Sequence, residues 1–218
     1  MNYRNILEKG TLILKHNSIL TASLDAELLL SISTKRSREK ILLNLSQKLK
    51  KEEIKSYVEL INRRKKKEPI SFITGKRYFW KSKFIVNRNV LTPRFETEFL
   101  VEDLLKIYKF SNNINVLDIG VGSGCILISL LKEKNKWKGT GLDISKLAIK
   151  IAKINAKIQQ VDNRIRFVNS DIDKFFSGKY DVIVTNPPYI NKIDYNNLDL
   201  GVKGYEPKLA LYGGIDGL

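Results

Sequence analysis

The sequence predicts an α/β protein in which a parallel sheet follows a small helical domain and a β-hairpin. Three patterns support this. Short apolar runs alternate with helix-like segments from residue 114 onward, the first 65 residues have helical periodicity, and the intervening residues 77–91 are rich in aromatic and β-branched side chains. A length of 218 residues with a hydrophobic content of 43% allows one medium domain and a small partner.

The N-terminal part is expected to be all-helical. One amphipathic face has the spacing i, i+3, i+4 and i+7, at Ile54, Tyr57, Val58 and Ile61. This helix ends in a run of basic residues, 63–67, where cations complement the negative end of the helix dipole. We interpret that run as a solvated helix terminus in preference to a dedicated nucleic-acid patch. The helical domain is assigned to residues 1–69.

The pattern changes in the segment that follows. Lys81, Ser82 and Lys83 interrupt the aromatic run and predict the turn of a β-hairpin. We place the joint between the domains in this hairpin, as a linker over residues 70–93. A helix is then predicted from Glu96 to about Phe110.

A second domain is predicted over residues 94–218. Its strands are expected at Asn115–Ile119, Gly139–Leu142, Ile165–Asn169 and Tyr180–Thr185, with helices at about 124–134 and 145–159. This alternation favours a parallel sheet with right-handed crossovers. Open α/β sheets bind ligands at the carboxyl ends of their strands. The residues that follow each strand are therefore the candidates for function.

The rare residues exclude several classes of site. A single cysteine, Cys125, forms no internal disulfide and no thiolate zinc cluster. A single histidine, His16, argues against a multi-histidine metal site and against a Ser-His-Asp triad. We therefore expect no metal ion. The apolar stretch 116–131 is broken by an aspartate and three glycines, and the N-terminus lacks the apolar core of a secretory signal. A cytoplasmic protein without a membrane partner is the expectation.

Positive charge is concentrated in the first part of the chain. The formal net charge is +16, and residues 1–95 hold 22 basic and 8 acidic residues, against 17 and 15 in residues 96–218. This asymmetry suggests an anionic partner for the first part. A lysine-rich genome composition explains it equally well, because 29 of the 39 basic residues are Lys. Direct binding to nucleic acid is compatible with this distribution but is not required by it.

The first candidate site is the segment 116–124, Val-Leu-Asp-Ile-Gly-Val-Gly-Ser-Gly. A buried strand runs into three alternate glycines, and a helix follows. Glycines let the backbone turn sharply and approach a ligand closely, and the helix N-terminus offers free N–H groups to an anion. A dinucleotide fingerprint would need its third glycine at position 125, where Cys125 stands, and the Gly-Lys-Ser/Thr end of a phosphate-binding P-loop is absent.

Two acidic residues follow the next strands. Asp143 ends the second strand, where a carboxylate can accept two hydrogen bonds from a ribose diol. It can equally cap the helix that starts at Ser145, and the two roles are compatible. Asp171 follows the third strand, where it is either a ligand-binding acidic group or an ordinary loop aspartate.

The sharpest signal is Asn186-Pro187-Pro188-Tyr189, after the fourth strand. Two prolines remove two backbone donors, fix φ at about −65° and hold the preceding residue outside the helical region. The Asn186 side-chain oxygen and the Pro187 carbonyl can each accept one N–H of an NH₂ group. Tyr189 can pack on the plane of that group. The segment is therefore a candidate to hold a planar nitrogen nucleophile.

Together these motifs resemble those of class I S-adenosylmethionine-dependent methyltransferases that act on the NH₂ group of adenine or of glutamine. Further segments resemble the release-factor glutamine methyltransferase family (HemK/PrmC). These are Glu68–Gly75, the Phe79-Trp80 hairpin, the block Thr92-Pro93-Arg94-Phe95-Glu96-Thr97-Glu98, and the tail from Tyr205 to Leu218. The resemblance extends from about residue 24 to the last residue.

The resemblance implies a function and a set of roles. The chain would transfer a methyl group from S-adenosylmethionine to the side-chain N5 of the glutamine in the Gly-Gly-Gln motif of peptide chain release factors. The helical domain would help to hold the release factor. The cofactor would be bound by Gly120, Val121, Gly122, Ser123, Gly124, Asp143, Asp171, Ile172 and Asn186. The glutamine would be bound by Asn186, Pro187, Pro188 and Tyr189, among which Asn186, Pro187 and Tyr189 would be catalytic.

The chain also departs from the family pattern. Phe95 stands where the family often has Pro, and Ile172 stands where it often has Trp. Class I methyltransferases have seven strands, whereas we predict about four, so an incomplete Rossmann-like sheet, as in a fragment or a truncated gene product, is expected. The fourth strand would then have an open edge and exposed apolar surface. Two alternatives stay open: an N6-adenine or guanine methyltransferase acting on RNA or DNA, and an inactive truncated remnant.

Overall fold

A computed structural model describes residues 1–217 and divides the chain into two compact units, Met1–Thr74 and Gly75–Leu218. Each unit has its own core and is described by itself. Within residues 1–217, no helix combines the length and the apolar character that crossing a membrane requires.

The first unit is helical, as predicted. Its helices are α1 (Tyr3–His16), α2 (Ala22–Thr34), α3 (Arg38–Leu42), α4 (Lys51–Lys65) and α5 (Ile70–Thr74). The prediction for the buried face of α4 is wrong at one position, because Val58 is 48% exposed whereas Leu60 is buried. Leu60 and Ile61 follow Tyr57 by three and four residues and lie on either side of it on the buried face. Val58 is rotated by about 100° from Tyr57 and falls at the edge of that face.

The basic run at the end of α4 is largely used within the unit itself. The Arg64 guanidinium contacts the buried carboxylate of Asp25 at 2.7 Å. Arg63 donates two hydrogen bonds to the carboxylate of Glu68, and the Lys67 ammonium donates to the Ser18 carbonyl at 2.8 Å. These contacts anchor the chain after α4, and they give the run a structural role beyond that of a solvated terminus.

The second unit begins with the hairpin. Strands β1 (Lys76–Phe79) and β2 (Ser82–Ile85) pair antiparallel, with Tyr78 opposite Lys83. The two-residue turn is formed by Trp80 and Lys81, and Trp80 has a φ of 52°. The predicted turn at residues 81–83 is therefore displaced, because Ser82 and Lys83 continue into β2. Phe79 and Phe84 are buried in the core of the second unit, which begins at Gly75.

The helix predicted from Glu96 begins slightly later. A 3₁₀ turn covers Phe95–Thr97, and α6 follows over Glu98–Ile107. Glu98 accepts a hydrogen bond from the Trp80 backbone N–H at 2.7 Å, which ties the start of α6 to the hairpin turn.

The central sheet is parallel and has the strand order β5-β4-β3-β6. The strands are β3 (Asn115–Ile119), β4 (Lys138–Asp143), β5 (Ile165–Asn169) and β6 (Val182–Thr185). The predicted bounds of β3 and β5 are confirmed, β4 is longer and β6 shorter. The chain runs from β3 outward to β5 and then returns to place β6 on the other side of β3. The space between the ends of β3 and β6 is therefore the topological switch point, where open sheets bind ligands.

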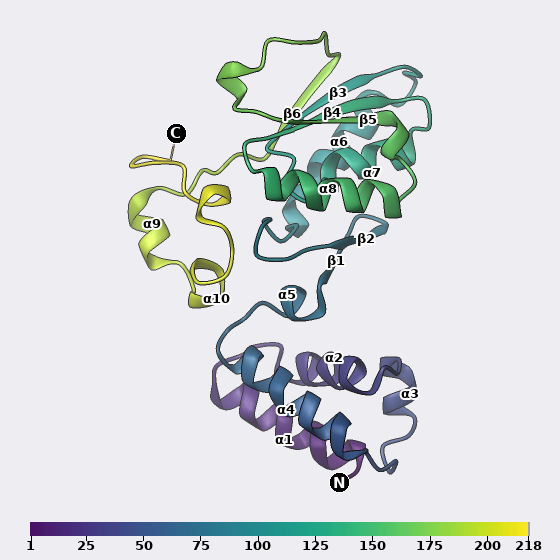
Figure 1. The fold of residues 1–218 in the computed structure, drawn as a ribbon, viewed down its shortest axis with the longest axis vertical. Coiled ribbons are helices and arrows are strands. Elements are labelled where there is room, and N and C mark those ends of the chain that lie inside the picture. Colours follow the sequence, from purple (N-terminus) through teal and green to yellow (C-terminus); the bar gives the residue numbers. More distant parts are fainter. Residues whose placement is uncertain (218) are drawn as a thin grey trace. The chain divides into compact units, whose positions relative to one another are not determined.

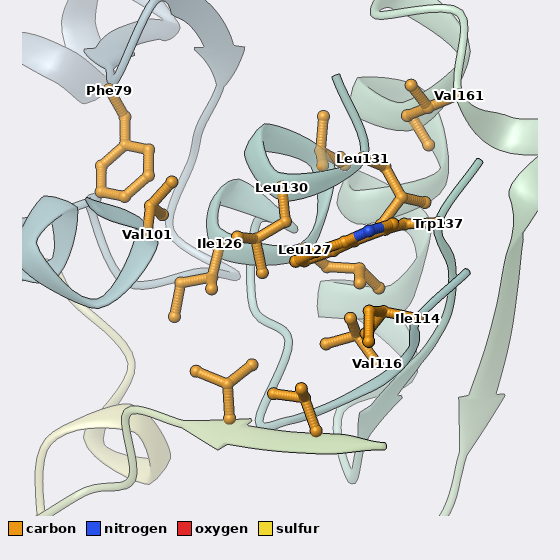
Figure 2. Close-up of a cluster of buried hydrophobic side chains, with 14 of the residues drawn as sticks. Phe79, Val101, Ile114, Val116, Ile126, Leu127, Leu130, Leu131, Trp137 and Val161 are labelled. Carbon is orange, nitrogen blue, oxygen red and sulfur yellow. The ribbon is translucent and has the colours of Figure 1, made fainter. Parts of the chain in front are cut away.

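Three helices cover one face of this sheet (Figure 1): α6, α7 (Cys125–Glu133) and α8 (Lys146–Ile158). Their apolar side chains pack on Val116, Val182 and Val184 from the strands. Figure 2 shows Trp137 in this cluster with Leu127 and Leu131 of α7 beside it, and Trp137 is fully buried. This core fixes α7 and α8 against β3 and β4.

The chain after β6 forms α9 (Lys192–Asn197), α10 (Leu200–Lys203) and a 3₁₀ turn over Lys208–Ala210. Within residues 1–217, β6 is an edge strand, and its Ile183 side chain is 63% exposed. This confirms the expected open edge with exposed apolar surface.

Candidate functional site

The two predicted site segments follow neighbouring strands and lie side by side. Ile119, the last residue of β3, pairs with Thr185, the last residue of β6. The Thr185 hydroxyl donates a hydrogen bond to the Ile119 carbonyl at 2.9 Å. Gly120 and Asn186 come directly after this pair, and adjacent strands are spaced about 4.8 Å apart. The glycine turn and the Asn-Pro-Pro-Tyr turn are thus neighbours at the switch point.

The glycine turn, residues 120–124, needs glycine because of its backbone conformation and because of the space around its Cα atoms. Gly120, Gly122 and Gly124 have positive φ values of 73°, 54° and 82°, which strain any residue with a Cβ. The space around Gly120 is open, since an added Cβ would meet nothing within 4 Å. At Gly124 an added Cβ would lie 2.7 Å from the Ile128 side chain. The first glycine therefore faces open space, and the last one faces α7.

The Asp143 carboxylate ties this turn to the end of β4. It accepts hydrogen bonds from the Gly122 N–H at 2.9 Å and from the Ser145 N–H at 2.8 Å. Ser145 itself caps α8 by accepting from the Ala148 N–H. Burial raises the pKa of Asp143, and the two N–H donors oppose that rise. Each carboxylate oxygen keeps a free lone pair, so these bonds leave Asp143 able to accept from a diol.

Asp118 of β3 and Cys125 at the start of α7 flank the turn in the chain and are poor candidates for chemistry. Burial, with a smaller contribution from the nearby Asp143 charge, raises the pKa of Asp118 to about 7, while a hydrogen bond from the Leu127 N–H opposes that rise. One of its oxygens, Oδ1, is buried without a hydrogen-bond partner. Burial also raises the pKa of the Cys125 thiol to about 12. The thiol therefore stays protonated at neutral pH and is not a nucleophile.

Asn155 supports the turn from α8 and was missed in the sequence. Its Nδ2 donates to the Ser123 carbonyl at 2.9 Å and to the Ile85 carbonyl at 3.0 Å. Its Oδ1 accepts from the Ile85 N–H at 2.7 Å. The side chain is fully buried, and it joins the glycine turn to the hairpin. Asn155 could have been found in the sequence as a polar residue on the otherwise apolar face of a predicted helix.

A cavity of about 400 Å³ opens in front of the glycine turn. Most of the predicted cofactor residues line it, namely Gly120, Val121, Gly122, Ser123, Asp143, Asp171, Ile172 and Asn186. Gly124 is not among the lining residues, because it turns toward α7. Asp171 uses one oxygen to cap a 3₁₀ turn at the Asp173 N–H, and Ile172 is 43% exposed. Predicted residues from the ends of four strands are thus brought to one cavity.

The Asn-Pro-Pro-Tyr turn, residues 186–189, lies between this cavity and a second one of about 470 Å³. Asn186 and Pro187 line both cavities, Pro188 lines only the first, and Tyr189 only the second. Tyr189 is 67% exposed. Asn186 donates a hydrogen bond from Nδ2 to the Thr97 hydroxyl at 3.2 Å.

The tail pairs with the chain just after this turn. The Ile190 N–H donates to the Leu211 carbonyl, and the Gly213 N–H donates to the Ile190 carbonyl, both at 3.0 Å. A Cβ on Gly213 would lie 2.5 Å from the Pro188 carbonyl oxygen, and one on Gly217 would lie 2.6 Å from that of Tyr189. The tail therefore approaches the turn at backbone contact distance.

A buried ion pair closes the same region. Arg94 contacts the carboxylate of Glu206 at 2.8 Å, and the Glu206 side chain is 2% exposed. Burial raises the pKa of Glu206, and the charge of Arg94 opposes that rise. Arg94 lines both cavities, so the pair fastens the tail to the walls of the site. Sequence reasoning matched both segments to a family but assigned neither residue a role.

The residues present fit S-adenosylmethionine. Open space lies in front of Gly120, where a Cβ would obstruct a bound molecule. The cavity has the volume of small-molecule sites, with carboxylates at Asp143 and Asp171 and an apolar wall at Ile172.

The comparisons with known proteins agree with this assignment. Residues 5–75 match the family model described as PrmC N-terminal domain, and residues 95–199 match Methyltransferase small domain. The chain is similar to "Release factor glutamine methyltransferase" of Caulobacter vibrioides, at 38% identity over 94% of this chain and 71% of the relative. The corresponding values for the protein of that name in Leptospira interrogans are 42%, 95% and 74%.

Other similarities are more partial. The chain is 35% identical to "Bifunctional methyltransferase" of Rickettsia typhi and covers 45% of that protein's length. A solved S-adenosylmethionine-dependent methyltransferase of Thiobacillus denitrificans, in complex with S-adenosyl-L-homocysteine, has a TM-score of 0.36 and 29% identity over 39% of this chain and 34% of its own. That TM-score is too low to support an inference.

The helical N-terminal region followed by a parallel sheet confirms the predicted fold class. Both family models and the two release factor relatives cover the corresponding parts of the chain. The chain therefore belongs to the release factor glutamine methyltransferase family of S-adenosylmethionine-dependent enzymes.

Proposed function

We propose that this protein methylates peptide chain release factors at the side-chain N5 of the glutamine in their Gly-Gly-Gln motif, with S-adenosylmethionine as the methyl donor. The observation that carries the proposal is the pairing of Ile119 with Thr185, which brings the glycine turn and the Asn-Pro-Pro-Tyr turn to one cavity. The chain spans 71% and 74% of the two release factor relatives and 45% of the bifunctional one.

The cofactor side of the site is formed by the ends of three strands. The backbone of Gly120 to Ser123 lies against the cofactor, and Gly124 completes the turn by packing toward α7. Asp143 accepts hydrogen bonds from a ribose diol, and Asp171 and Ile172 form the wall beside the adenine. When bound, S-adenosylmethionine supplies an electrophilic methyl group on a sulfonium. The two backbone donors on Asp143 hold its carboxylate in place, so that its free lone pairs have a fixed direction.

The amide side of the site is formed by the Asn-Pro-Pro-Tyr turn. The Asn186 Oδ1 and the Pro187 carbonyl accept the two N–H groups of the substrate amide, and Tyr189 packs on its plane. Positioning of this kind contributes roughly 7–11 kcal/mol in well-oriented reactions. The same acceptors would stabilise the positive charge that develops on the nitrogen as its bond to the methyl group forms. Loss of one amide proton, during or after the transfer, then removes that charge. No described residue lining either cavity is His or Lys, so catalysis rests on orientation.

The helical domain, residues 1–69, is proposed to hold the release factor. Methylation of a nucleic-acid base is the less favoured alternative. That alternative is compatible with the Asn-Pro-Pro-Tyr turn and with the excess of basic residues in positions 1–95. Three of those basic residues, Arg63, Arg64 and Lys67, make contacts within the helical unit instead.

The experiment is a methyl-transfer assay with labelled S-adenosylmethionine and three acceptors: a release factor, the same release factor with its Gly-Gly-Gln glutamine changed to alanine, and bulk RNA. We expect label in the first acceptor only, on the peptide that carries the glutamine. Label in RNA would contradict the proposed substrate. Label retained in the alanine variant would contradict the proposed acceptor atom.

A further inference from the structure

We propose that Thr97 is a positioning residue for Asn186, which holds the donor end of its amide so that the acceptor end is presented to the substrate. The inference rests on the proposed function and adds a residue to it. Thr97 belongs to the block of residues 92–98, for which the sequence indicated a family likeness but no role.

The argument begins with the polarity of the amide. An asparagine side chain has an acceptor end, Oδ1, and a donor end, Nδ2. A substrate NH₂ group is a donor, so it is bound only if Oδ1 faces it. The Nδ2 of Asn186 donates to the Thr97 hydroxyl at 3.2 Å. Within residues 1–217 this is the side-chain hydrogen bond that Asn186 makes, so Oδ1 is left for a substrate.

Thr97 is itself held rigidly. Its side chain is buried, at 7% exposure, and its backbone N–H donates to the Arg94 carbonyl at 3.2 Å. Arg94 is fixed by the ion pair with Glu206, and Glu98 accepts from the Trp80 N–H. The contacts of Arg94 and Glu98, which lie on either side of Thr97 in the chain, therefore fix the position of the Thr97 hydroxyl. A fixed acceptor of this kind limits the rotation of the Asn186 amide.

Thr97 also lies at the correct place in the site. It lines both cavities, as Asn186 and Pro187 do. The contact spans 89 residues of sequence and joins the start of α6 to the end of β6. Removal of the hydroxyl would leave the amide free to present Nδ2, a donor, to the donor group of the substrate. A misoriented reactant of this kind can lower the rate by up to about 100-fold.

The test compares Thr97→Val, which keeps the shape and loses the acceptor, with Thr97→Ser, which keeps the acceptor. We expect Thr97→Val to lower kcat on release factor by about 10–100-fold. Its affinity for S-adenosylhomocysteine should stay within about threefold, and Thr97→Ser should stay near wild type. In an Asn186→Ala background, Thr97→Val should change kcat by less than about twofold. Three results would each overturn the assignment. One is a wild-type kcat in Thr97→Val, and another is an equal loss of kcat in Thr97→Val and Thr97→Ser. The third is a loss of kcat in the double variant equal to the sum, in free energy, of the Thr97→Val and Asn186→Ala losses.

A second measurement needs no turnover. In ¹⁵N spectra, the side-chain NH₂ signals of Asn186, identified by their loss in Asn186→Ala, should exchange with water more slowly in wild type and Thr97→Ser than in Thr97→Val. Equal exchange in all three would overturn the contact. If the protected amide is found and wild type leaves release factor unmethylated, the proposed function fails while the Thr97 assignment is supported.

Discussion

The two turns at the switch point are supported in different ways. The glycine turn is held by elements that are next to it in the sheet or pack on it: the Leu142 carbonyl and the Asp143 carboxylate at the end of β4, and Asn155 of α8. The Asn-Pro-Pro-Tyr turn is held by segments outside the sheet and its packed helical core, namely Thr97 just before α6 and the tail around Gly213. The first turn is part of the α/β core, and the second depends on parts added around that core.

This difference indicates which contacts fix the position of each turn. The position of the glycine turn is set by the hydrogen-bonded strands of the parallel sheet. Changes in the nearby core should therefore affect both folding and cofactor binding. The Asn-Pro-Pro-Tyr turn is stiffened by its own prolines and then oriented by distant contacts. Changes in those contacts should affect turnover more than folding or cofactor affinity. Three predictions test this contrast, from the largest expected effect to the smallest.

Asn155→Leu should be the most damaging change to stability. It removes the partners of the Ile85 N–H and of the carbonyls of Ile85 and Ser123, and a buried polar group without a partner costs about 1–3 kcal/mol. We expect a loss of about 3–4 kcal/mol in the free energy of unfolding, measured by urea denaturation. The matched control is Gln159→Met at the C-cap of the same helix, which also bonds to the hairpin, at Lys83. If Asn155→Leu lowers the free energy of unfolding no more than this control does, Asn155 is not a main support of the glycine turn.

Asp118 should make the stability of the glycine-turn region depend on pH. Its folded pKa of about 7 lies above the ordinary value of 3.8, so the folded state binds the proton more tightly. The contribution is full below pH 4 and is lost as pH rises through 7. We expect wild type to lose about 2 kcal/mol between pH 5 and pH 7 relative to Asp118→Asn. Parallel pH profiles of unfolding for the two proteins would show that Asp118 does not titrate in this range.

Gly213→Ala should act on the other turn. Gly213 does not have a left-handed φ, so its lack of a Cβ matters only for space, next to the Pro188 carbonyl. We expect a modest loss of stability, about 1–2 kcal/mol, because the tail must shift away from the turn. Turnover on release factor should fall, and the affinity for S-adenosylhomocysteine, which reports on the glycine turn, should stay within about threefold. Equal losses of turnover and cofactor affinity would show that the two turns are not separately supported.

The same contrast explains what could be predicted from the sequence. Strands β3 and β5 were located correctly because each is a short apolar run between turn residues. The turn motifs were visible because glycine and proline restrict the backbone locally. The hairpin turn was predicted one residue too late in the chain, because the side chains of Ser82 and Lys83 do not reveal which residues pair across the hairpin.

The supports of the turns were harder to predict. Asn155 was detectable in principle, as a polar residue on a buried helical face. The partnership of Thr97 with Asn186, and that of Arg94 with Glu206, span 89 and 112 residues. Such contacts are decided by how elements pack, and neither periodicity nor motif spacing reports on them. The sequence therefore indicated the reacting groups but not what orients them.

The central claim is that one turn holds the cofactor and the other holds the substrate amide. It is tested most directly in Asn186→Ala, by titration with S-adenosylhomocysteine and by initial rates on release factor in the same preparation. The account predicts a loss of kcat of at least about 100-fold with cofactor affinity within about threefold of wild type. A kcat within about tenfold of wild type, or a loss of cofactor affinity as large as the loss of turnover, would contradict it.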